Sequence, residues 1–487
     1  MMNELGKLHR GRLKAVEERI NVLNVIPDRD RNHQCNDPLP SKKPGIEVIS
    51  SFEKLLKQSG EITCLTSQRT IDCSKFPSPC VAIVDLFSNY VLDGIRSMAT
   101  PEELPIVAWA PGSAGSTLMF WGPEEYRDGG GGGIENGKAQ IEAFDSSESL
   151  FGQTADKVLR IPGYPPMYDY ERKPQEYTGT VSSALVKVGM KSLMASDGVI
   201  TVSFPVIEKE GIEACDRYFG SLGKSHFSVG PLELMPDVTE GRDAVTDGVL
   251  LFLDKMEGEF GEKSVIFISF GTLFWPTNTS VFDAIIDELK TTKTPFIVAH
   301  PSPVARTSKG LLDKIRACPY GLELAWAPQK RILSHPATGW FLTHGGSNSV
   351  QEALTFKVPM ILWPANDDQP LHASLLSIQF KAAFELIEVR SGIYGKKIPY
   401  RYRHSDGPTP KFTVESAKKE FGQVLKDLRG TMGLVVRKNF EELATRVGRV
   451  WDEDGIARKG LEAFLKEYVD TGRKSFTCRS YFEIARL

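Results

Sequence analysis

The sequence lacks the features that mark membrane-spanning, secreted or nucleic-acid-binding proteins. No segment approaches the about 18 consecutive apolar residues that a bilayer-spanning helix needs. The charged N-terminus, MMNELGKLHRGRLKAVEERI, has no apolar signal-peptide core. The net charge of −3 gives no electrostatic reason to expect nucleic acid or an anionic membrane as the main partner. These absences predict a protein without a transmembrane segment, although they leave peripheral membrane contact open.

Paired cysteines are also missing. The seven cysteines are scattered along the chain without a CxxC motif. An odd, dispersed set favours reduced thiols in a cytoplasmic protein over a disulfide framework or a zinc site. We therefore expect a cytoplasmic protein without a bound metal, and we take it to be a monomer.

The sequence is long and alternates regularly between strand-like and helix-like segments. A chain of 487 residues exceeds what one hydrophobic core usually serves, so two domains of about 200 residues each are expected. The apolar segment Val81–Phe87 predicts a buried parallel strand, and the helix-like NYVLDGIRSMA follows it. Similar alternation in the second half indicates an α/β fold for both domains.

A charged stretch punctuated by glycine and proline separates the two halves. Such composition is typical of an interdomain linker, which we place at residues 237–247. The first domain is then expected at 1–236 and the second at 248–466. The remaining residues, 467–487, form a C-terminal segment.

The most informative stretch is WAPQKRILSHPATGWFLTHGGSNSVQEALTFKVPMILWPANDDQ, residues 326–369. Within it, TGWFLT predicts a strand that ends at His344, and the apolar spacing of 348–356 predicts a helix. The two glycines between them allow a tight turn. Backbone N–H groups at the start of that helix would bind a diphosphate. Side-chain donors would come from His344, Asn348 and Ser349.

A second strand end points to the same ligand. The strand-like SVIFISFGTLFWP ends at Gly271 and Thr272. Ligands of open α/β sheets bind outside the carboxyl ends of the strands. Thr272 can therefore offer its hydroxyl and N–H groups to the diphosphate.

Residues 326–369 resemble the signature box of family 1 UDP-glycosyltransferases of plants and fungi, with the family's length of 44 residues. The resemblance implies the GT-B architecture, in which two Rossmann-like domains face a cleft. It also implies a UDP-sugar donor and a small hydroxylated acceptor, with no cofactor or metal. The sugar is expected to be glucose, since Gln369 resembles the residue that the family's glucosyltransferases use. In this family the final helix returns to the first domain, which 468–487 would do here.

The resemblance assigns the donor residues one by one. Trp326 would stack on the uracil, Gln329 would contact the base and ribose, and Glu352 the ribose hydroxyls. Asp368 and Gln369 would hold hydroxyls of the sugar, and His344, Asn348 and Ser349 would hold the diphosphate. The predicted UDP-sugar site also includes Thr272, Ala327, Gly346 and Ser347.

Single residues of the box also have plain structural interpretations. Trp326 taken alone is more typical of a core tryptophan. Glu352 alone fits a helix capping box that starts at Ser349. Ser347 departs from the family's plant form, which has tryptophan there, so one packing contact beside the phosphates is in question. Asp367 with Asp368 could suggest a metal pair, but no third hard ligand accompanies them.

The resemblance implies an inverting transfer that needs a general base. In the family this base is a histidine after the first strand, held by an aspartate that Asp85 matches. The strand and histidine have no counterpart here, and the charged, helical context of His9 does not fit. Asp85 and His344 are therefore the predicted catalytic residues. The alternative is a UDP-sugar-binding protein without transferase activity, or a truncated inactive form, because the expected histidine is absent.

Two further motifs have weaker interpretations. Gly132–Lys138 scans as GxxxxGK, but Ala139 follows where a phosphate loop has Ser or Thr. Residues 394–403, YGKKIPYRYR, mix basic and aromatic side chains, which could bind single-stranded nucleic acid. A solvated surface insertion is the favoured interpretation of that segment.

Overall fold

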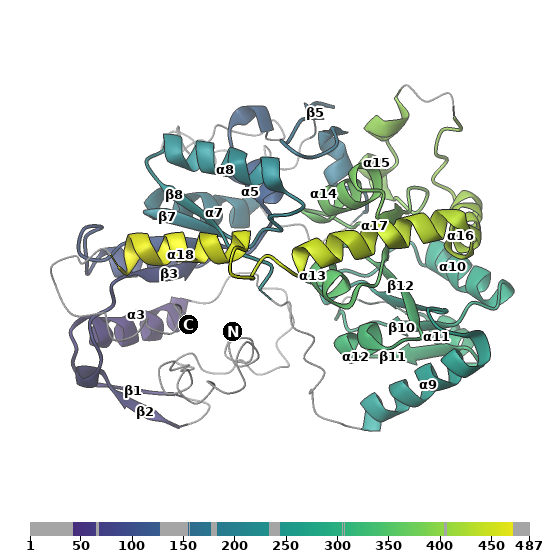
Figure 1. The fold of residues 1–487 in the computed structure, drawn as a ribbon, viewed down its shortest axis with the longest axis horizontal. Coiled ribbons are helices and arrows are strands. Elements are labelled where there is room, and N and C mark those ends of the chain that lie inside the picture. The colour runs from purple at the N-terminus through teal and green to yellow at the C-terminus, as the bar shows by residue number, and fades with distance from the viewer. Residues whose placement is uncertain are drawn as a thin grey trace.

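Two parallel sheets, each accompanied by helices, form the protein (Figure 1). The computed structural model describes residues 42–64, 68–126, 154, 156–176, 183–232, 244–303, 305, 307–403 and 407–470. The segments that contain His9 and Gly132–Lys138 lie outside these residues. The architecture is the expected α/β arrangement of two Rossmann-like domains.

The first domain is built on a four-stranded parallel sheet in the order β3-β4-β7-β8. Its strands are β3 (Ala82–Asp85), β4 (Ile106–Ala110), β7 (Gly198–Thr201) and β8 (Ser225–Ser228). Its helices are α3 (Lys42–Leu56), α4 (Asn89–Arg96), α5 (Ala114–Trp121), α7 (Ser183–Ala195) and α8 (Lys209–Ser221). Its smaller elements are β1 (Glu61–Thr63), β2 (Thr70–Asp72), β5 (Val158–Leu159), β6 (Met167–Tyr168), η1 (Cys73–Lys75), η2 (Glu124–Tyr126) and η4 (Asp169–Arg172).

Strand β3 differs from the predicted buried strand. It pairs with β4, and within the described part of the chain this is its sole strand neighbour. Its burial alternates, and Ile83 is 50% exposed. An edge strand has a neighbouring strand on one side only, and one of its faces can be exposed. A run of apolar residues therefore does not show that the strand is buried on all sides.

The second domain is built on a six-stranded parallel sheet in the order β11-β10-β9-β12-β13-β14. Its strands are β9 (Val265–Ser269), β10 (Phe296–Ala299), β11 (Gly321–Leu324), β12 (Thr338–Thr343), β13 (Met360–Leu362) and β14 (Ala383–Glu385). Its helical elements are α9 (Ala244–Phe260), α10 (Thr279–Thr291), α11 (Lys309–Arg316), α12 (Gln329–Ser334), α13 (Ser347–Phe356), α14 (Gln369–Ser374), η5 (Leu375–Gln379), α15 (Gly392–Gly395), η6 (Tyr400–Tyr402), α16 (Val414–Arg429) and α17 (Thr431–Val447). The short strand β14 was not predicted, because three residues carry no readable periodicity.

Two element boundaries differ from those expected. Helix α9 begins at Ala244, inside the predicted linker. Helix α18 (Ile456–Tyr468), predicted to close the second domain, instead packs on β8 of the first (Figure 1). The rings of Phe464 and Tyr468 lie 5.5 and 5.9 Å from that of Phe227. The chain therefore crosses back to the first domain before residue 468.

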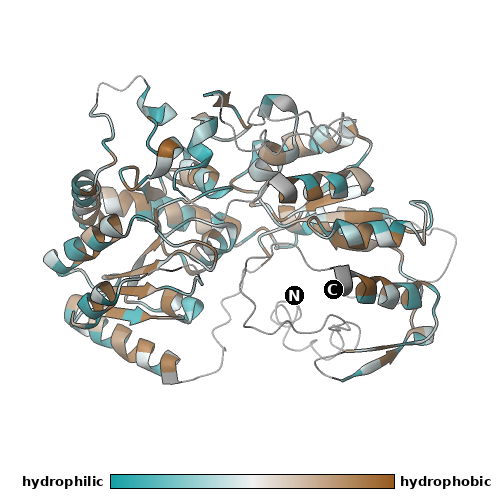
Figure 2. Cartoon of the chain, turned by 180° about the vertical axis from the view of Figure 1, so that it is seen from behind, coloured by the Kyte–Doolittle hydropathy of each residue, from teal (hydrophilic) through white to brown (hydrophobic). Residues whose placement is uncertain are grey.

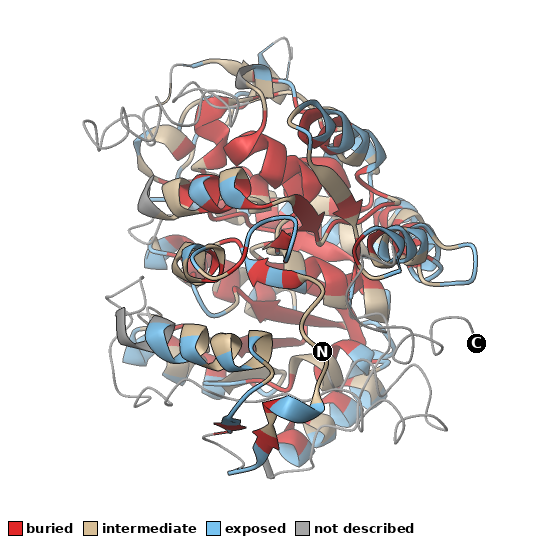
Figure 3. Cartoon of the chain, turned by 90° about the vertical axis from the view of Figure 1, so that its left-hand side faces the viewer, coloured by how far each residue is buried: buried red, intermediate tan, exposed pale blue. Residues whose placement is uncertain are grey.

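Apolar residues gather on the strands and on the inner helix faces (Figure 2). The same inner surfaces are buried, and the outer helix faces are exposed (Figure 3). One cluster of buried apolar residues continues from the first domain into the second. None of the helices in the described part of the chain combines the length and apolar character needed to cross a bilayer.

The predicted surface insertion is a contact between the domains. We define the clasp as residues 389–403, which leave the second domain and lie against residues 156–176 of the first. The hydroxyl of Tyr170 donates to the carbonyl of Ile398 at 2.6 Å, and the N–H of Ser391 donates to the carbonyl of Pro174 at 2.9 Å. The solvated interpretation is wrong for this contact, because Lys397, Ile398 and Tyr400 each hydrogen-bond to a residue of the first domain.

Candidate functional site

The predicted donor box follows the carboxyl edge of the second sheet. It begins after β11, includes β12 and β13, and ends at the start of α14. β9 and β12 are parallel neighbours, with Ser269 paired to Thr343. The turns that carry Thr272 and His344 therefore leave the sheet at the same edge.

Trp326 is the first residue of the donor box. Its side chain is 57% exposed, whereas Ala327 directly after it is buried. The interpretation of Trp326 as a core residue is therefore wrong. An exposed indole anchored by a buried neighbour can offer its face to a planar base.

Gln329 and Glu352 come together from two helices. The Nε2 group of Gln329, at the start of α12, donates a hydrogen bond to Oε2 of Glu352 on α13. The capping interpretation of Glu352 is wrong, because α13 is capped by Gly346 and Ser349 lies inside the helix. The carboxylate is thus held in the box by another predicted donor residue.

Two left-handed glycines shape the turns around His344. Gly271 and Gly345 have φ values of 71° and 82°, which glycine adopts without strain. A Cβ atom at Gly271 would lie 2.8 Å from Cε1 of His344, and one at Gly346 would lie 2.7 Å from its Nε2. The imidazole therefore packs directly against the backbone of both turns.

Helix α13 begins immediately after this turn. Gly346 is its N-cap, and Ser347 is its first residue. The first N–H groups of a helix have no partner within the helix, and the helix dipole is positive there. Asn348 is exposed and Ser349 is buried in this first turn. The arrangement can bind a diphosphate as predicted.

His344 contributes to this site as a neutral ring. Burial lowers the pKa of His344 to about 4, assisted by His372 and opposed by Asp368. Its Nδ1 lies 3.2 Å from the hydroxyl of Thr343. At neutral pH the imidazole can therefore hydrogen-bond a phosphate, while the helix N-terminus supplies the positive potential.

Local hydrogen bonds brace the two residues that are predicted to hold the sugar, Asp368 and Gln369. The hydroxyl of Ser347 donates to Oδ2 of Asp368 at 2.8 Å. Oε1 of Gln369 accepts from the N–H groups of Ala365 and Asn366 at 2.9 and 3.1 Å. Gln369 therefore presents its NH₂ group as the donor left for a ligand. Ser347, in place of tryptophan, orients one carboxylate oxygen of Asp368.

His372 supports the turn and was not predicted. It is buried, and its Nδ1 lies 2.9 Å from the carbonyl oxygen of Gly345. Since a carbonyl can only accept, Nδ1 carries the proton. A histidine four residues into the next helix gives no local sequence signal for this contact.

Asp85 lies at the carboxyl end of β3. It is exposed, and its Oδ1 accepts the N–H of Phe87 at 2.9 Å. His226 is the only histidine among the described residues of the first domain, and it contacts Asp216 and Thr201 instead. The described residues therefore place Asp85 at the expected strand end and show no histidine hydrogen-bonded to it.

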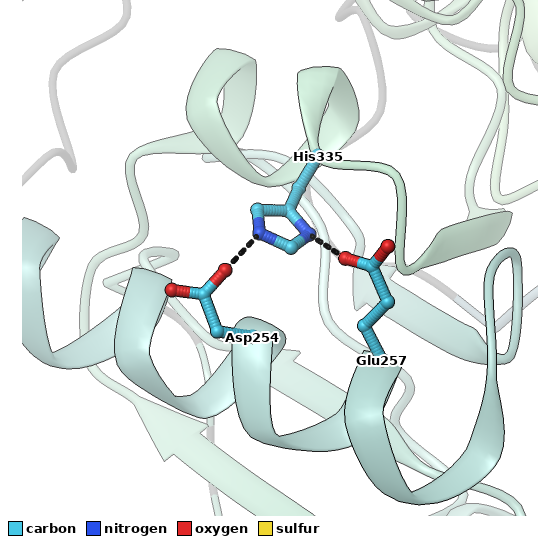
Figure 4. A group of neighbouring side chains, drawn as sticks. All are labelled: Asp254, Glu257 and His335. Carbon is cyan, nitrogen blue, oxygen red and sulfur yellow. Dashed lines mark hydrogen bonds and ion pairs between the residues drawn. The ribbon is translucent and has the colours of Figure 1, made fainter.

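One cluster in the second domain has metal-ligand residue types. Asp254 and Glu257 project from α9 towards His335 (Figure 4). They approach opposite ring nitrogens, at 3.1 Å to Nε2 and 4.0 Å to Nδ1, and Nδ1 also accepts the N–H of Ala337. One ion cannot bind both sides of a ring. His335 precedes β12, at the sheet edge opposite His344, so the cluster is separate from the residues predicted to bind the donor.

The chain is similar to known proteins. Residues 249–391 match the family described as UDP-glucoronosyl and UDP-glucosyl transferase. The UDP-glycosyltransferase eriJ of Hericium erinaceus is 31% identical over 408 residues, covering 80% of this chain and 79% of that protein. An anthocyanidin 3-O-glucosyltransferase of Solanum melongena is 32% identical over 254 residues, covering 51% and 54%.

Solved structures agree in fold. A Polygonum tinctorium UDP-glucosyltransferase that glucosylates indoxyl covers 91% of this chain and 85% of its own, with a TM-score of 0.60 at 22% identity. A transferase from Siraitia grosvenorii in complex with UDP covers 88% of both chains, with a TM-score of 0.62 at 20% identity. The two domains have the GT-B fold. The chain belongs to the UDP-glycosyltransferase family.

Proposed function

We propose that the protein transfers glucose from UDP-glucose to a hydroxyl group of a small acceptor, with inversion at the anomeric carbon and without a metal. The observation that carries this proposal is the donor box, in which an exposed Trp326, the Gln329–Glu352 pair and the glycine turn follow one sheet edge. Several relatives are glucosyltransferases of small molecules, which supports the same donor and acceptor class.

The mechanism follows from what each group can do. The acceptor oxygen attacks the anomeric carbon opposite the diphosphate, and a general base must take up its proton. We assign Asp85 to orient that base, and none of the described residues hydrogen-bonded to Asp85 is a histidine that could fill this role. UDP leaves towards the start of α13, where unpaired N–H groups and neutral His344 stabilise the developing negative charge. Asp368 and Gln369 hold sugar hydroxyls. The acceptor lies against the first domain.

Cys73, Cys215 and Cys318 are free thiols, which fits the proposed cytoplasmic location. We also propose that the protein acts as a monomer and needs no cofactor.

A transfer assay tests the proposal. The protein is incubated with UDP-glucose and a panel of phenols and alcohols, and both UDP release and the glycoside mass are measured. We expect a glycoside with inverted configuration, formed equally well with a chelator present. UDP release without glycoside, retention of configuration or loss of activity with the chelator would each contradict a part of the proposal.

A further inference from the structure

Turn η4 of the first domain contacts the end of the donor box that is predicted to bind the sugar. This turn packs against α14, whose first residue is Gln369. Two neighbouring residues of η4, Glu171 and Arg172, are 4% and 5% exposed. Buried charges need partners, so the groups around each one show what η4 is built to hold.

Glu171 anchors η4 to the clasp. Its Oε1 accepts the N–H of Tyr168 at 3.0 Å within the first domain and the N–H of Tyr400 at 2.7 Å across the boundary. Its Oε2 lies 3.4 Å from Nη1 of Arg390. Arg390 and Tyr400 lie near the two ends of the clasp, so one carboxylate holds both of them.

The second domain completes this ionic cluster. Nη2 of Arg390 lies 3.2 Å from Oε1 of Glu385, and Oε2 of Glu385 also accepts from Arg401. Arg390 and Glu385 are 3% and 2% exposed as side chains. Two arginines and two glutamates balance each other in this cluster, which holds η4 against the clasp and β14.

Arg172 points to a different partner. Its guanidinium carbon lies 5.7 Å from the ring centre of Phe120. Burial lowers the pKa of Arg172 to about 10, and the charge that opposes this is Asp367. The group is still a cation at neutral pH, in the same region as the turn that precedes α14.

Asp367 is the acidic partner of Arg172 in the second domain. It has a left-handed φ of 57° and directly precedes the sugar-binding Asp368. Burial and Asp368 raise the pKa of Asp367 to about 7, while Arg172 and Lys173 of the first domain oppose the rise. Two adjacent carboxyl groups at one turn repel each other, and a neighbouring cation relieves that repulsion.

We propose that Arg172 is a positioning residue for the donor sugar, because η4, held by the clasp, brings its guanidinium to the turn formed by Asp367 and Asp368. The inference rests on the proposed function, which assigns sugar hydroxyls to Asp368 and Gln369. The sugar subsite is then completed across the domain boundary. The residues predicted to bind UDP all lie in the second domain.

The first test separates UDP from UDP-glucose. Arg172→Ala should leave the Kd for UDP within about twofold of wild type and raise the KM for UDP-glucose by fivefold or more. Arg172→Lys keeps the charge and should recover part of the loss. Arg160→Ala is the matched control, because Arg160 is an exposed arginine whose Nη2 lies 3.3 Å from the clasp hydroxyl of Tyr400. It should behave as wild type.

A purely structural role predicts a different pattern. It would lower the thermal midpoint of Arg172→Ala without changing the ratio of UDP-glucose affinity to UDP affinity. An unchanged ratio in folded Arg172→Ala would overturn the inference. If wild type failed to bind UDP, the proposed function would fail instead, so the two results are distinguishable.

A pH profile supplies a second readout. The groups facing Asp367 are Asp368, Arg172 and Lys173, and the rings of His344 and His372 lie near Asp368. Removing the guanidinium should move the inflection of kcat/KM for UDP-glucose near pH 7 upward by about one unit. An inflection that stays in place in Arg172→Ala would contradict the inference.

Discussion

The donor box and the first-domain side of the boundary hold their functional residues in different ways. In the box, predicted residues hydrogen-bond to one another across short stretches of sequence. Ser347 and Asp368 are 21 positions apart, and Gln329 and Glu352 are 23 positions apart. In the first domain, Glu171 and Arg172 depend on partners more than 190 positions away, such as Asp367, Arg390 and Tyr400. A local motif can be read from the sequence, whereas a site assembled across domains cannot.

The largest effect is expected from replacing Asp85, the predicted catalytic residue of the first domain. Asp85→Asn should lower kcat by about 10² to 10⁴-fold, because a general base that is no longer oriented loses its contribution. The measurement is glycoside formation from UDP-glucose with a reactive phenol. The affinity for UDP, measured by calorimetry, should not change. Wild-type turnover in Asp85→Asn would show that the base is held elsewhere.

The second prediction tests the ionic cluster between the domains. Arg390→Ala leaves Glu171 and Glu385 buried without their shared partner, so the free energy of unfolding should fall by about 3 to 5 kcal/mol. Denaturant titration measures this. The matched control is Lys255→Ala on α9, which breaks an exposed pair with Glu259 and should cost about 0.3 to 0.5 kcal/mol. Similar losses in both variants would show that the cluster does not join the domains.

The third prediction returns to the box. Glu352→Ala should weaken UDP binding by about 1 to 3 kcal/mol, since a charged hydrogen-bond acceptor is lost. Glu352→Gln keeps the size of the side chain, so stability should change by about a few tenths of a kcal/mol while UDP affinity still drops. A proportional fall in thermal midpoint and affinity would indicate that Glu352 acts on the fold rather than on the ligand.

The smallest loss of stability is expected from replacing Trp326. Its ring is 57% exposed, so Trp326→Ala should leave the thermal midpoint nearly unchanged. The loss of base stacking should nevertheless weaken UDP binding by about 1 to 3 kcal/mol. Binding of inorganic pyrophosphate is the control and should not respond. A variant that loses stability but not UDP affinity would restore the core interpretation of Trp326.

The sequence predicted the parts of the fold that depend on local pattern. The apolar runs of β9 and β12 are fully buried, and the glycine turn at His344 lies where the strand was expected to end. Residues of the box follow one sheet edge because parallel strands end together. The pairing of Glu352 with Gln329, rather than with its own helix, depends on how α12 and α13 pack, and no local pattern specifies that.

The errors share one physical cause. The basic, aromatic clasp has the composition of a solvated loop, yet Tyr400 and Arg390 are held by Glu171 from the other domain. Helix α18 has an ordinary amphipathic pattern that does not say which sheet its apolar face covers. Neither composition nor amphipathic pattern identifies the surface that a segment contacts, because the tertiary arrangement decides it.

Calorimetric titration of the wild-type protein with UDP and, separately, with inorganic pyrophosphate tests the central claim most directly. The donor box predicts that UDP binds at least about 100-fold more tightly, because Trp326 and the Gln329–Glu352 pair contact the uridine that pyrophosphate lacks. Equal affinity for the two ligands would contradict the assignment of these residues and, with it, the account of this site as a UDP-sugar donor site.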